Sequence, residues 1–397
     1  MVGLRTLCGQ RAIHFLPTML VIFTLPLKSP GSPNFTSINA MYVGITAIRS
    51  RESFFNMTSS RLLANRTPVV SPVRVATGNS FWAVVIGIDD YQGQPLAGCV
   101  FDATSFFQYL TADLRVPTDH VALLLGTTPQ SCNQAPDATS ILATRANIVD
   151  TFLRLSTNPQ IQNGDNIIIY FSGHGACYRC CDYDPYKGTI AETGTIEALC
   201  PMDRNPNAQE ANKLIPDISD REISTILAEI HRIKGHHITV ILDCCHASGV
   251  TRDVPIGRSL AVARQVRPLY TSGEIAAMLA AGQEILEKLE KNDDGSSRYK
   301  SIFEGDWKTV SKGIHVMLAA CRSFELATEV RCGENTHGVF TEQLLRKLRE
   351  VGVVGELPTY LAFAKDIGLS ELKQYPMVVG DNKGERLWFT VRPRACC

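Results

Sequence analysis

The sequence predicts an α/β fold, a three-layer sandwich whose mostly parallel central sheet is covered by helices on both faces. Several short segments are almost continuously apolar, as is typical of strands buried on both sides. Segments with apolar residues at helical spacing separate them. Such alternation of strand and helix favours a parallel sheet. With 397 residues, of which 45% are hydrophobic, the chain can bury a large core.

The first half of the regular pattern contains three predicted strands and two helices. Residues 81–88 form a nearly continuous apolar run, which predicts a doubly covered strand. Residues 98–110 carry apolar side chains at helical spacing, and 123–125 are short and apolar. Thr144 has the side chain to cap the next helix. A third apolar run, Ile-Ile-Ile-Tyr-Phe-Ser, then leads to His174.

The second half continues this alternation. Ser219-Asp-Arg-Glu222 is a capping-box pattern, which predicts the start of a helix. The apolar run after it, Thr-Val-Ile-Leu-Asp, leads to Cys245. A further helix is expected over 274–291 and a further strand over 314–320, and Thr341 is expected to cap the helix that follows.

Charge and cysteine content exclude several classes. The chain has 39 basic and 39 acidic residues, so no nucleic-acid partner is indicated and no stable membrane insertion is expected. Thirteen cysteines, an odd number scattered along the chain, argue against a full disulfide framework. A reducing compartment, the cytoplasm, is the simplest expectation.

The chain is expected to divide into an N-terminal tail (1–79), a folded domain (80–392) and a short C-terminal tail (393–397). The first 51 residues contain no Asp or Glu, and the apolar stretch at 14–27 is too short for a membrane span. The N-terminal tail fits a disordered segment, a mitochondrial targeting sequence or a secretion signal. Three Asn-x-Thr matches would suit secretion, at Asn34, Asn56 and Asn65.

A base and a thiol follow two of the predicted strands. Active sites in parallel sheets lie beyond the carboxyl ends of the strands, where His174 and Cys245 fall. A thiol attacks well only as the thiolate, and a histidine can accept its proton near neutral pH. This pairing indicates a cysteine hydrolase. Cys244 is adjacent to Cys245, and because neighbouring side chains along a strand point to opposite faces, only one of the two can meet His174.

Longer segments resemble a known family. Tyr170-Phe-Ser-Gly-His-Gly175 followed by Asp243-Cys-Cys-His246 is similar to the paired signatures of metacaspases, relatives of the caspases among cysteine peptidases. The resemblance runs in order from Phe81 to Phe389 and is nearest to fungal members. It also includes Gly98–Ala103, Leu318–Ser323, Gly338–Thr341 and Gln374–Pro376. It implies a caspase-like fold for residues 80–392 and an endopeptidase that is made as a zymogen and acts in apoptosis.

The resemblance also implies roles for single residues. His174 would be the general base, and Cys245, immediately before His246, would be the nucleophile. The backbone amides of Gly175 and Cys245 would bind the oxyanion. Asp102, Ser172 and Asp243 match positions that line the primary specificity pocket. Two carboxylates together favour a cationic guest, so the implied cleavage is after Arg or Lys of a protein or peptide substrate. The alternative for Asp102 is that it only caps the helix after it.

The resemblance supports a calcium site less well than it supports the catalytic residues. Many metacaspases bind it through acids near the site, but this chain has Ile196 and Arg221 where two acids are common. Asp203, Asp220 and Asp253 remain as candidate ligands, fewer than a hard cation prefers. The chemistry itself requires no cofactor, and calcium stays an alternative.

Two further features leave alternatives open. Four cysteines near His174 have one spacing seen in zinc sites, but a structural zinc site normally shows two such pairs, which favours ordinary loop cysteines: Cys177, Cys180, Cys181 and Cys200. Residues 251–312 are rich in Arg and Lys, so they could be a self-processing segment or a solvated surface loop. For the whole chain, the alternative to an active peptidase is a caspase-like scaffold that acts through partners.

Overall fold

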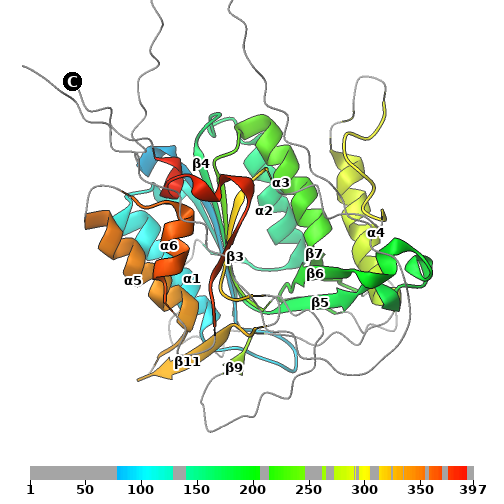
Figure 1. The fold of residues 1–397 in the computed structure, drawn as a ribbon, viewed down its shortest axis with the longest axis horizontal. Helices are drawn as coiled ribbons and strands as arrows, with labels where there is room; N and C mark the ends of the chain where they lie inside the picture. Colours follow the sequence, from blue (N-terminus) through cyan, green and yellow to red (C-terminus); the bar gives the residue numbers. More distant parts are fainter. Residues whose placement is uncertain are drawn as a thin grey trace, which may run out of the picture. The chain divides into compact units, whose positions relative to one another are not determined.

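A seven-stranded sheet forms the centre of the domain (Figure 1). The strand order is β13-β10-β8-β4-β1-β2-β3, and every neighbouring pair is parallel except β10 with β13. All eight residues of β1, which lies between β4 and β2, are buried, as its continuous apolar run predicts. The strands are β1 (Phe81–Ile88), β2 (Val121–Gly126), β3 (Ile141–Leu142), β4 (Asn166–Ser172), β8 (Ile238–Asp243), β10 (Val316–Ala319) and β13 (Met377–Val379).

Helices cover both faces of this sheet, so the predicted α/β architecture is confirmed (Figure 1). One face carries α1 (Cys99–Gln108), α5 (Val339–Val353) and α6 (Tyr360–Asp366). The other face carries α2 (Arg145–Thr157) and α3 (Asp220–Lys234), and α4 (Ser272–Lys288) packs on α3.

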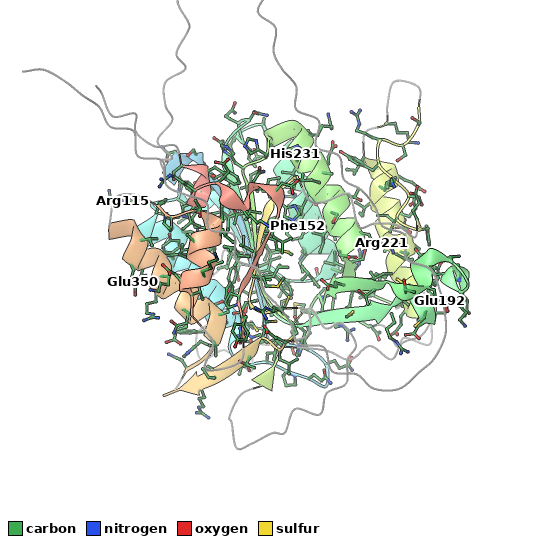
Figure 2. The ribbon with its side chains drawn as sticks, in the orientation of Figure 1. Arg115, Phe152, Glu192, Arg221, His231 and Glu350 are labelled. Carbon is green, nitrogen blue, oxygen red and sulfur yellow. The ribbon has the colours of Figure 1, made fainter. Side chains whose placement is uncertain are left out.

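Alternate side chains of the sheet enter the two cores. Val84 of β1 packs in the core under α2 and α3, whereas Val85 packs in the core under α1 and α5. Figure 2 shows Phe152 on the sheet side of α2, and Glu350 on the outer side of α5. This pattern is the amphipathic arrangement expected from the helical spacing.

The structure describes residues 78–127, 140–205, 214–245, 262–264, 272–289, 291, 295–304, 313–322, 325–333, 335–353, 357–368 and 374–390. The predictions for the two tails, for His246 and for Asp253 therefore lie outside the described residues. No helix within these ranges is both long and apolar enough to cross a membrane.

Two small antiparallel sheets were not predicted. One contains β5 (Gly175–Arg179), β6 (Thr195–Leu199) and β7 (Ile218–Ser219), and begins three residues beyond β4. The other contains β9 (Val262–Ala263), β11 (Thr328–Cys332) and β12 (Asn335–Gly338). These strands are two to five residues long and have no regular apolar pattern. Their pairing depends on distant segments, which local sequence does not reveal.

The predicted helix caps have mixed outcomes. Thr144 caps α2 by accepting a hydrogen bond from the Asn147 amide, at 3.3 Å. Ser219 caps α3 in the same way through the Glu222 amide. The prediction for Thr341 is wrong, because α5 begins at Val339 and Thr341 lies inside its first turn. Its hydroxyl instead donates to Asp243 at 2.6 Å, so a tertiary partner replaced the local role.

Only half of the capping box at α3 forms. The Glu222 carboxylate does not return to its own helix but accepts two hydrogen bonds from Arg145 Nη2, at 2.6 and 2.9 Å. The Glu222 side chain is fully buried and Arg145 is 14% exposed. Burial raises the pKa of Glu222 to about 7 despite this partner. The ion pair therefore ties the start of α2 to the start of α3.

We expect Arg145→Ala to lower the free energy of unfolding by about 3 kcal/mol, because it leaves the buried Glu222 carboxylate without its cation. The loss should be smaller at pH 5 than at pH 8, since protonation of Glu222 removes the uncompensated charge. Denaturant unfolding at both pH values measures it. Arg154→Ala is the control: Arg154 pairs with Asp150 on the exposed side of α2, and should cost at most about 1 kcal/mol. Equal losses for the two variants would contradict the role given to the Arg145–Glu222 pair.

Candidate active site

The pairing of β4 with β8 determines which residues meet beyond the sheet. These parallel strands are in register, with Ser172 opposite Asp243 as the last pair. His174 and Cys245 each follow two residues later, so they leave the sheet at the same level. The Gly173 amide also donates to the Asp243 carbonyl at 3.4 Å, which continues the pairing past the strand ends. Two residues 71 positions apart are thus held next to each other by backbone register.

The His174 ring is buried and fixed in orientation. Its Nε2 lies 2.8 Å from the Gln94 carbonyl oxygen, which can only accept, so Nε2 carries the proton. The Tyr91 hydroxyl accepts a hydrogen bond from the His174 amide, and the two ring centroids are 4.5 Å apart. Nδ1 has no hydrogen-bond partner among the described residues. Burial lowers the pKa of His174 to about 4, so at neutral pH Nδ1 is an unprotonated acceptor.

Cys244 and Cys245 point to opposite sides of the sheet. Cys244 packs in the core beneath α2 and α3, and Cys245 packs in the core beneath α1 and α5. The Cys245 sulfur accepts a hydrogen bond from the Ala327 amide at 3.0 Å and lies 3.4 Å from the Ala327 carbonyl oxygen. The segment just before β11 therefore contacts Cys245, whereas Cys244 faces the interior.

Two backbone amides converge on one oxygen beside the thiol. The Gly175 and Cys245 amides donate to the carbonyl oxygen of Arg264 at 3.3 and 3.2 Å. A methyl group on Gly175 would overlap the Cys245 carbonyl oxygen, so only glycine permits this approach. Paired amides of this kind can stabilise negative charge on an oxygen.

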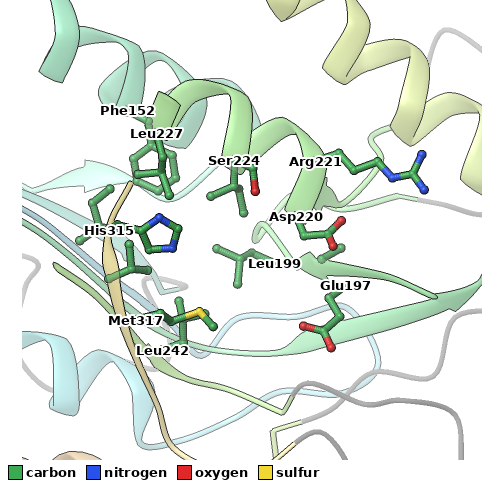
Figure 3. Close-up of a pocket in the computed structure, with 14 residues that line it drawn as sticks. Phe152, Glu197, Leu199, Asp220, Arg221, Ser224, Leu227, Leu242, His315 and Met317 are labelled. Carbon is green, nitrogen blue, oxygen red and sulfur yellow. The ribbon is translucent and has the colours of Figure 1, made fainter. Parts of the chain in front are cut away.

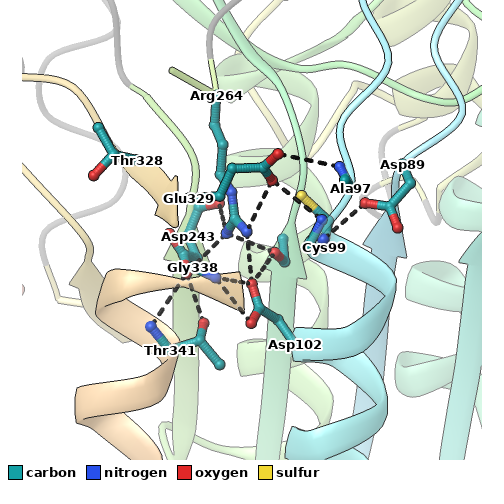
Figure 4. Close-up of polar contacts among 12 residues, drawn as sticks. Asp89, Ala97, Cys99, Asp102, Asp243, Arg264, Thr328, Glu329, Gly338 and Thr341 are labelled. Atoms are coloured by element: carbon teal, nitrogen blue, oxygen red, sulfur yellow. Dashed lines mark hydrogen bonds and ion pairs between the residues drawn. The ribbon is translucent and has the colours of Figure 1, made fainter. Parts of the chain in front are cut away.

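The Arg264 side chain fills a buried acidic cluster, formed by Asp102, Asp243 and Glu329 (Figure 4). Its Nη2 lies 2.7 Å from Asp102 and 3.5 Å from Glu329, and its Nη1 lies 2.9 Å from Asp243. Nη1 also donates to the Ser172 hydroxyl at 2.9 Å. Arg264 is 0% exposed. The three positions that the sequence assigned to a specificity pocket thus surround one guanidinium.

The alternative role for Asp102, a cap of α1, is wrong. Asp89 provides that cap, since its carboxylate accepts from the Cys99 amide at 2.7 Å and from the Val100 amide. The Asp102 carboxylate instead accepts from the Gly338 amide, at 2.9 Å for Oδ2. Burial raises the pKa of Asp102 to about 7, while Arg264 opposes this rise. Asp102 therefore needs a cationic neighbour to remain charged.

Several residues of this site have no local signal in the sequence. Glu329 lies on β11, and its carboxylate accepts from the Ala97 and Gly98 amides at 3.1 and 3.2 Å, which holds it over the start of α1. Gln94 contributes only a carbonyl group, which any residue could supply. Gly338 belongs to a segment that matched the family pattern, but no role was assigned to it. Arg264 was one of several basic residues in its segment, and nothing local distinguished it.

The candidate calcium ligands do not form a calcium site in the described structure. Asp203 is 2.8 Å from the Arg145 amide at the start of α2. Asp220 lies with Glu197 at one end of a cavity of about 230 Å³ (Figure 3), and burial raises the pKa of Asp220 to about 7. Within the described ranges, no three possible ligands gather.

Arg221 stands beside Asp220, where the resemblance leads one to expect a second acid, and its side chain forms hydrogen bonds with protein groups. Its Nη1 donates to the Tyr186 hydroxyl and to the Ile302 and Glu304 carbonyl oxygens, between 2.6 and 2.9 Å. The guanidinium thus holds the loop after α4 against α3. Among the described residues, the oxygen donors at this place are therefore too few for a calcium ion.

The cysteines near His174 do not gather into a metal site either, as far as the described residues go. Cys177, Cys180 and Cys200 are buried, and Cys181 is half-buried. The Cys200 thiol donates to Asp217 at 3.5 Å, and none of the described cysteines forms a disulfide. Among the described residues, these four cysteines therefore do not lie close enough together to form a metal site.

Comparison with known proteins points to one family. Residues 82–255 match the model of the metacaspase peptidase C14 domain. Two curated relatives, Metacaspase-1 from Saccharomyces cerevisiae strains YJM789 and ATCC 204508 / S288c, are each 28% identical over 175 residues. The match covers 44% of this chain and 34% of each relative, so the chain spans about a third of the length of the curated relatives it matches.

Two solved structures align with most of the chain. Protein GSU0716 from Geobacter sulfurreducens aligns with a TM-score of 0.47 and 18% identity, over 79% of this chain and 99% of that one. Caspase-1 from Spodoptera frugiperda aligns with a TM-score of 0.40 and 8% identity, over 79% and 93%. The matched family segment includes both His174 and Cys245. Residues 82–255 of this chain are therefore similar to the metacaspase peptidase C14 domain, a domain of cysteine peptidases.

Proposed function

We propose that the protein is a cysteine endopeptidase that cleaves after Arg or Lys, with His174 as base and Cys245 as nucleophile. One observation carries this proposal: Arg264 occupies the site as the residue before a cleaved bond would. Its carbonyl oxygen meets two amides beside Cys245, and its guanidinium meets the acidic cluster. The site therefore recognises the backbone and the side chain of one arginine together.

We propose the usual order of events of a cysteine peptidase. Nδ1 of His174 makes no hydrogen bond in this structure, either to the Cys245 sulfur or to any other described group. Neutral His174 takes the Cys245 proton at Nδ1, while the Gln94 carbonyl holds the ring through Nε2. The thiolate attacks the substrate carbonyl carbon, and the Gly175 and Cys245 amides stabilise the resulting oxyanion. His174 then returns the proton to the departing amine. Water hydrolyses the thioester and restores the thiol.

Charge supports the choice of substrate. Three buried carboxylates repel an acidic side chain, and a neutral one would leave them without a cation. Arginine satisfies Asp102 and Asp243 through different nitrogens, as the contacts of Arg264 show. Lysine would bind as a single charge. Glu329 adds a third carboxylate that the specificity argument from sequence did not include.

We also propose that catalysis does not require calcium. The donors near Asp220 support this, because Arg221 stands where an acid is common in the family and binds protein groups instead. Every chemical step above uses groups of the chain itself and water.

The first prediction concerns the nucleophile. We expect the protein to hydrolyse peptide reporters that end in Arg or Lys and to leave Asp reporters intact, and Cys245→Ala to abolish this activity. The matched control is Cys244→Ala, which should retain activity because Cys244 faces the other core. Reporter fluorescence measures both. Hydrolysis of none of the reporters by any form would favour the scaffold alternative, and hydrolysis of Asp reporters alone would contradict the acidic specificity site.

The second prediction concerns Gly338, whose missing side chain leaves room for the guanidinium. A methyl group there would overlap Arg264 Nη1 and the carboxylates of Asp102 and Asp243. We expect Gly338→Ala to lower kcat/KM for Arg reporters by about 100-fold, because the cation can no longer reach its partners.

Gly352 provides the matched control for Gly338. It lies in α5, which begins directly after Gly338, and a methyl group there meets nothing within 4 Å. Gly352→Ala should therefore keep full activity. Equal activity of the two variants in steady-state assays would refute the position assigned to the substrate cation.

The third prediction concerns calcium. We expect neither added Ca²⁺ nor a chelator to change kcat/KM for Arg reporters, because no step uses the ion. Titration of Ca²⁺ into chelator-treated protein tests this. A rise in activity that saturates with Ca²⁺ would show that residues outside the described ranges, such as Asp253, complete a site.

A further inference from the structure

The cavity of about 230 Å³ lies on the α2 and α3 side of the main sheet (Figure 3). One wall is α3, which presents Asp220, Ser224 and Leu227 to the cavity at the spacing of a single helix face. The opposite wall is the sheet, which contributes Leu242 of β8 and Met317 of β10. The cavity therefore runs along about two turns of α3, a length of roughly 10 Å.

Two polar atoms without partners lie at the two ends of this cavity. Asp220 Oδ1 and His315 Nδ1 are buried atoms that have no hydrogen-bond partner among the described residues. His315 directly precedes β10 and is only 9% exposed, and its ring points into the cavity at the end away from Asp220 (Figure 3). A buried polar atom is costly unless another group bonds to it. Each end therefore calls for a partner that the described part of the chain does not supply.

The middle of the cavity suits an apolar group better than water. Its walls there carry side chains that offer no strong hydrogen bond: Leu199, Leu227, Leu242 and Met317. A buried water molecule needs several polar partners, so water can serve the two ends but not the middle. Covering apolar walls with an apolar group is favourable. One molecule with an apolar body and two polar ends would therefore match the whole cavity.

The Asp220 end favours a cation. Glu197 of β6 lies with Asp220 at this end, and burial and the charge of Glu197 together raise the pKa of Asp220 to about 7. Figure 3 shows the Arg221 guanidinium directed away from Asp220, and its Nη1 bonds to Tyr186 and to two backbone carbonyl groups. An ammonium group would bring both a donor for Asp220 Oδ1 and a positive charge.

The His315 end favours a neutral hydroxyl group. Burial lowers the pKa of His315 to about 4, so its ring is neutral at pH 7, and Nδ1 donates or accepts according to the tautomer. A hydroxyl group can do either. Figure 3 places Phe152 and Leu227 beside His315, so a charged group at this end would be buried next to apolar side chains.

We propose that this cavity is a binding site for a small aromatic amine that carries a hydroxyl group at its far end. The ammonium group binds Asp220, the ring lies between α3 and the sheet, and the hydroxyl group binds His315. Since a cavity of about 150 Å³ holds benzene, this cavity has room for a benzene ring with a short side chain. The proposal is independent of peptidase activity, because the cavity and Cys245 lie on opposite sides of the sheet.

The test is the binding of tyramine to the full chain at pH 7.5, measured by isothermal titration calorimetry. We expect one saturable site with a Kd of about 0.1 mM, a usual strength for so small a ligand. Two analogues separate the ends, since phenylethylamine lacks the hydroxyl group and para-ethylphenol lacks the amine. We expect each analogue to bind about 10-fold more weakly than tyramine. Cys245→Ala should bind tyramine as the unaltered chain does.

Variants assign each end to its residue. Asp220→Asn should weaken tyramine about 10-fold and leave para-ethylphenol unchanged, because only the amine needs the charge. His315→Leu should weaken tyramine to the level of phenylethylamine and leave phenylethylamine unchanged. Ser224→Leu should abolish all binding, because the larger side chain fills the middle of the cavity. Its matched control is Ala228→Leu, on the same helix but outside the cavity lining, which should bind normally.

Several results would overturn the proposal. Absence of saturable tyramine binding by the folded chain would mean that water alone occupies the cavity. Binding that survives Ser224→Leu would place the amine elsewhere, for example at the acidic cluster around Arg264. Equal Kd values for tyramine and para-ethylphenol would reject the cation at Asp220, and equal values for tyramine and phenylethylamine would reject the hydroxyl group at His315. If a variant does not fold, as judged by thermal unfolding, the two analogues still decide.

Discussion

Two parallel strands, β4 and β8, pair with Ser172 opposite Asp243, and the arrangement of the site depends on this register. The last pair places two polar side chains around the Arg264 guanidinium, and two residues later His174 and Cys245 leave the sheet together. A shift of one residue would turn every side chain of a strand to the opposite face. It would exchange Cys245 for Cys244. The buried apolar runs of both strands prevent such a shift, because each side chain must enter the correct core.

Electrostatics underlies the selectivity that we propose for this site. Asp102, Asp243 and Glu329 are buried within reach of one another's charge, and burial together with the charge of Asp243 raises the pKa of Asp102 to about 7 although Arg264 opposes this rise. Such a cluster is costly without a cation, and removing one partner of a buried pair is strongly destabilising. Arg264 supplies the cation and offers nitrogens to all three acids. The requirement that makes the cluster unstable when empty supports the proposed preference for a basic side chain.

A second arginine has a different effect on the opposite side of the sheet. Arg221 follows Asp220 at the start of α3, and its guanidinium binds the Tyr186 hydroxyl and two backbone carbonyl groups. The Arg221 guanidinium therefore connects α3 to neighbouring loops by direct hydrogen bonds. Arg145 and Glu222 form a further connection between α2 and α3 one residue later. The start of α3 is thus stabilised by arginines, where the family pattern leads one to expect acids and a metal.

The sequence by itself determined the layered α/β fold and the alternation of its main strands and helices along the chain, because buried strands and amphipathic helices carry periodic apolar patterns. It also identified His174, Cys245, Asp102, Ser172 and Asp243 as candidates, since each lies in a short and specific local pattern. Cap positions were predicted where the partner is local, as at Thr144, and missed where a distant group competes, as at Thr341.

Only the tertiary structure decided what those candidates contact. Glu329 and Gln94 reach the site from segments without any distinctive pattern, one through a carboxylate on β11 and the other through a backbone carbonyl. Nothing local separates Arg264 from the other basic residues of its segment. Its role follows from strand pairing and burial, which join residues 162 positions apart in the chain. Long-range packing, and not residue type, selected the arginine that occupies the site.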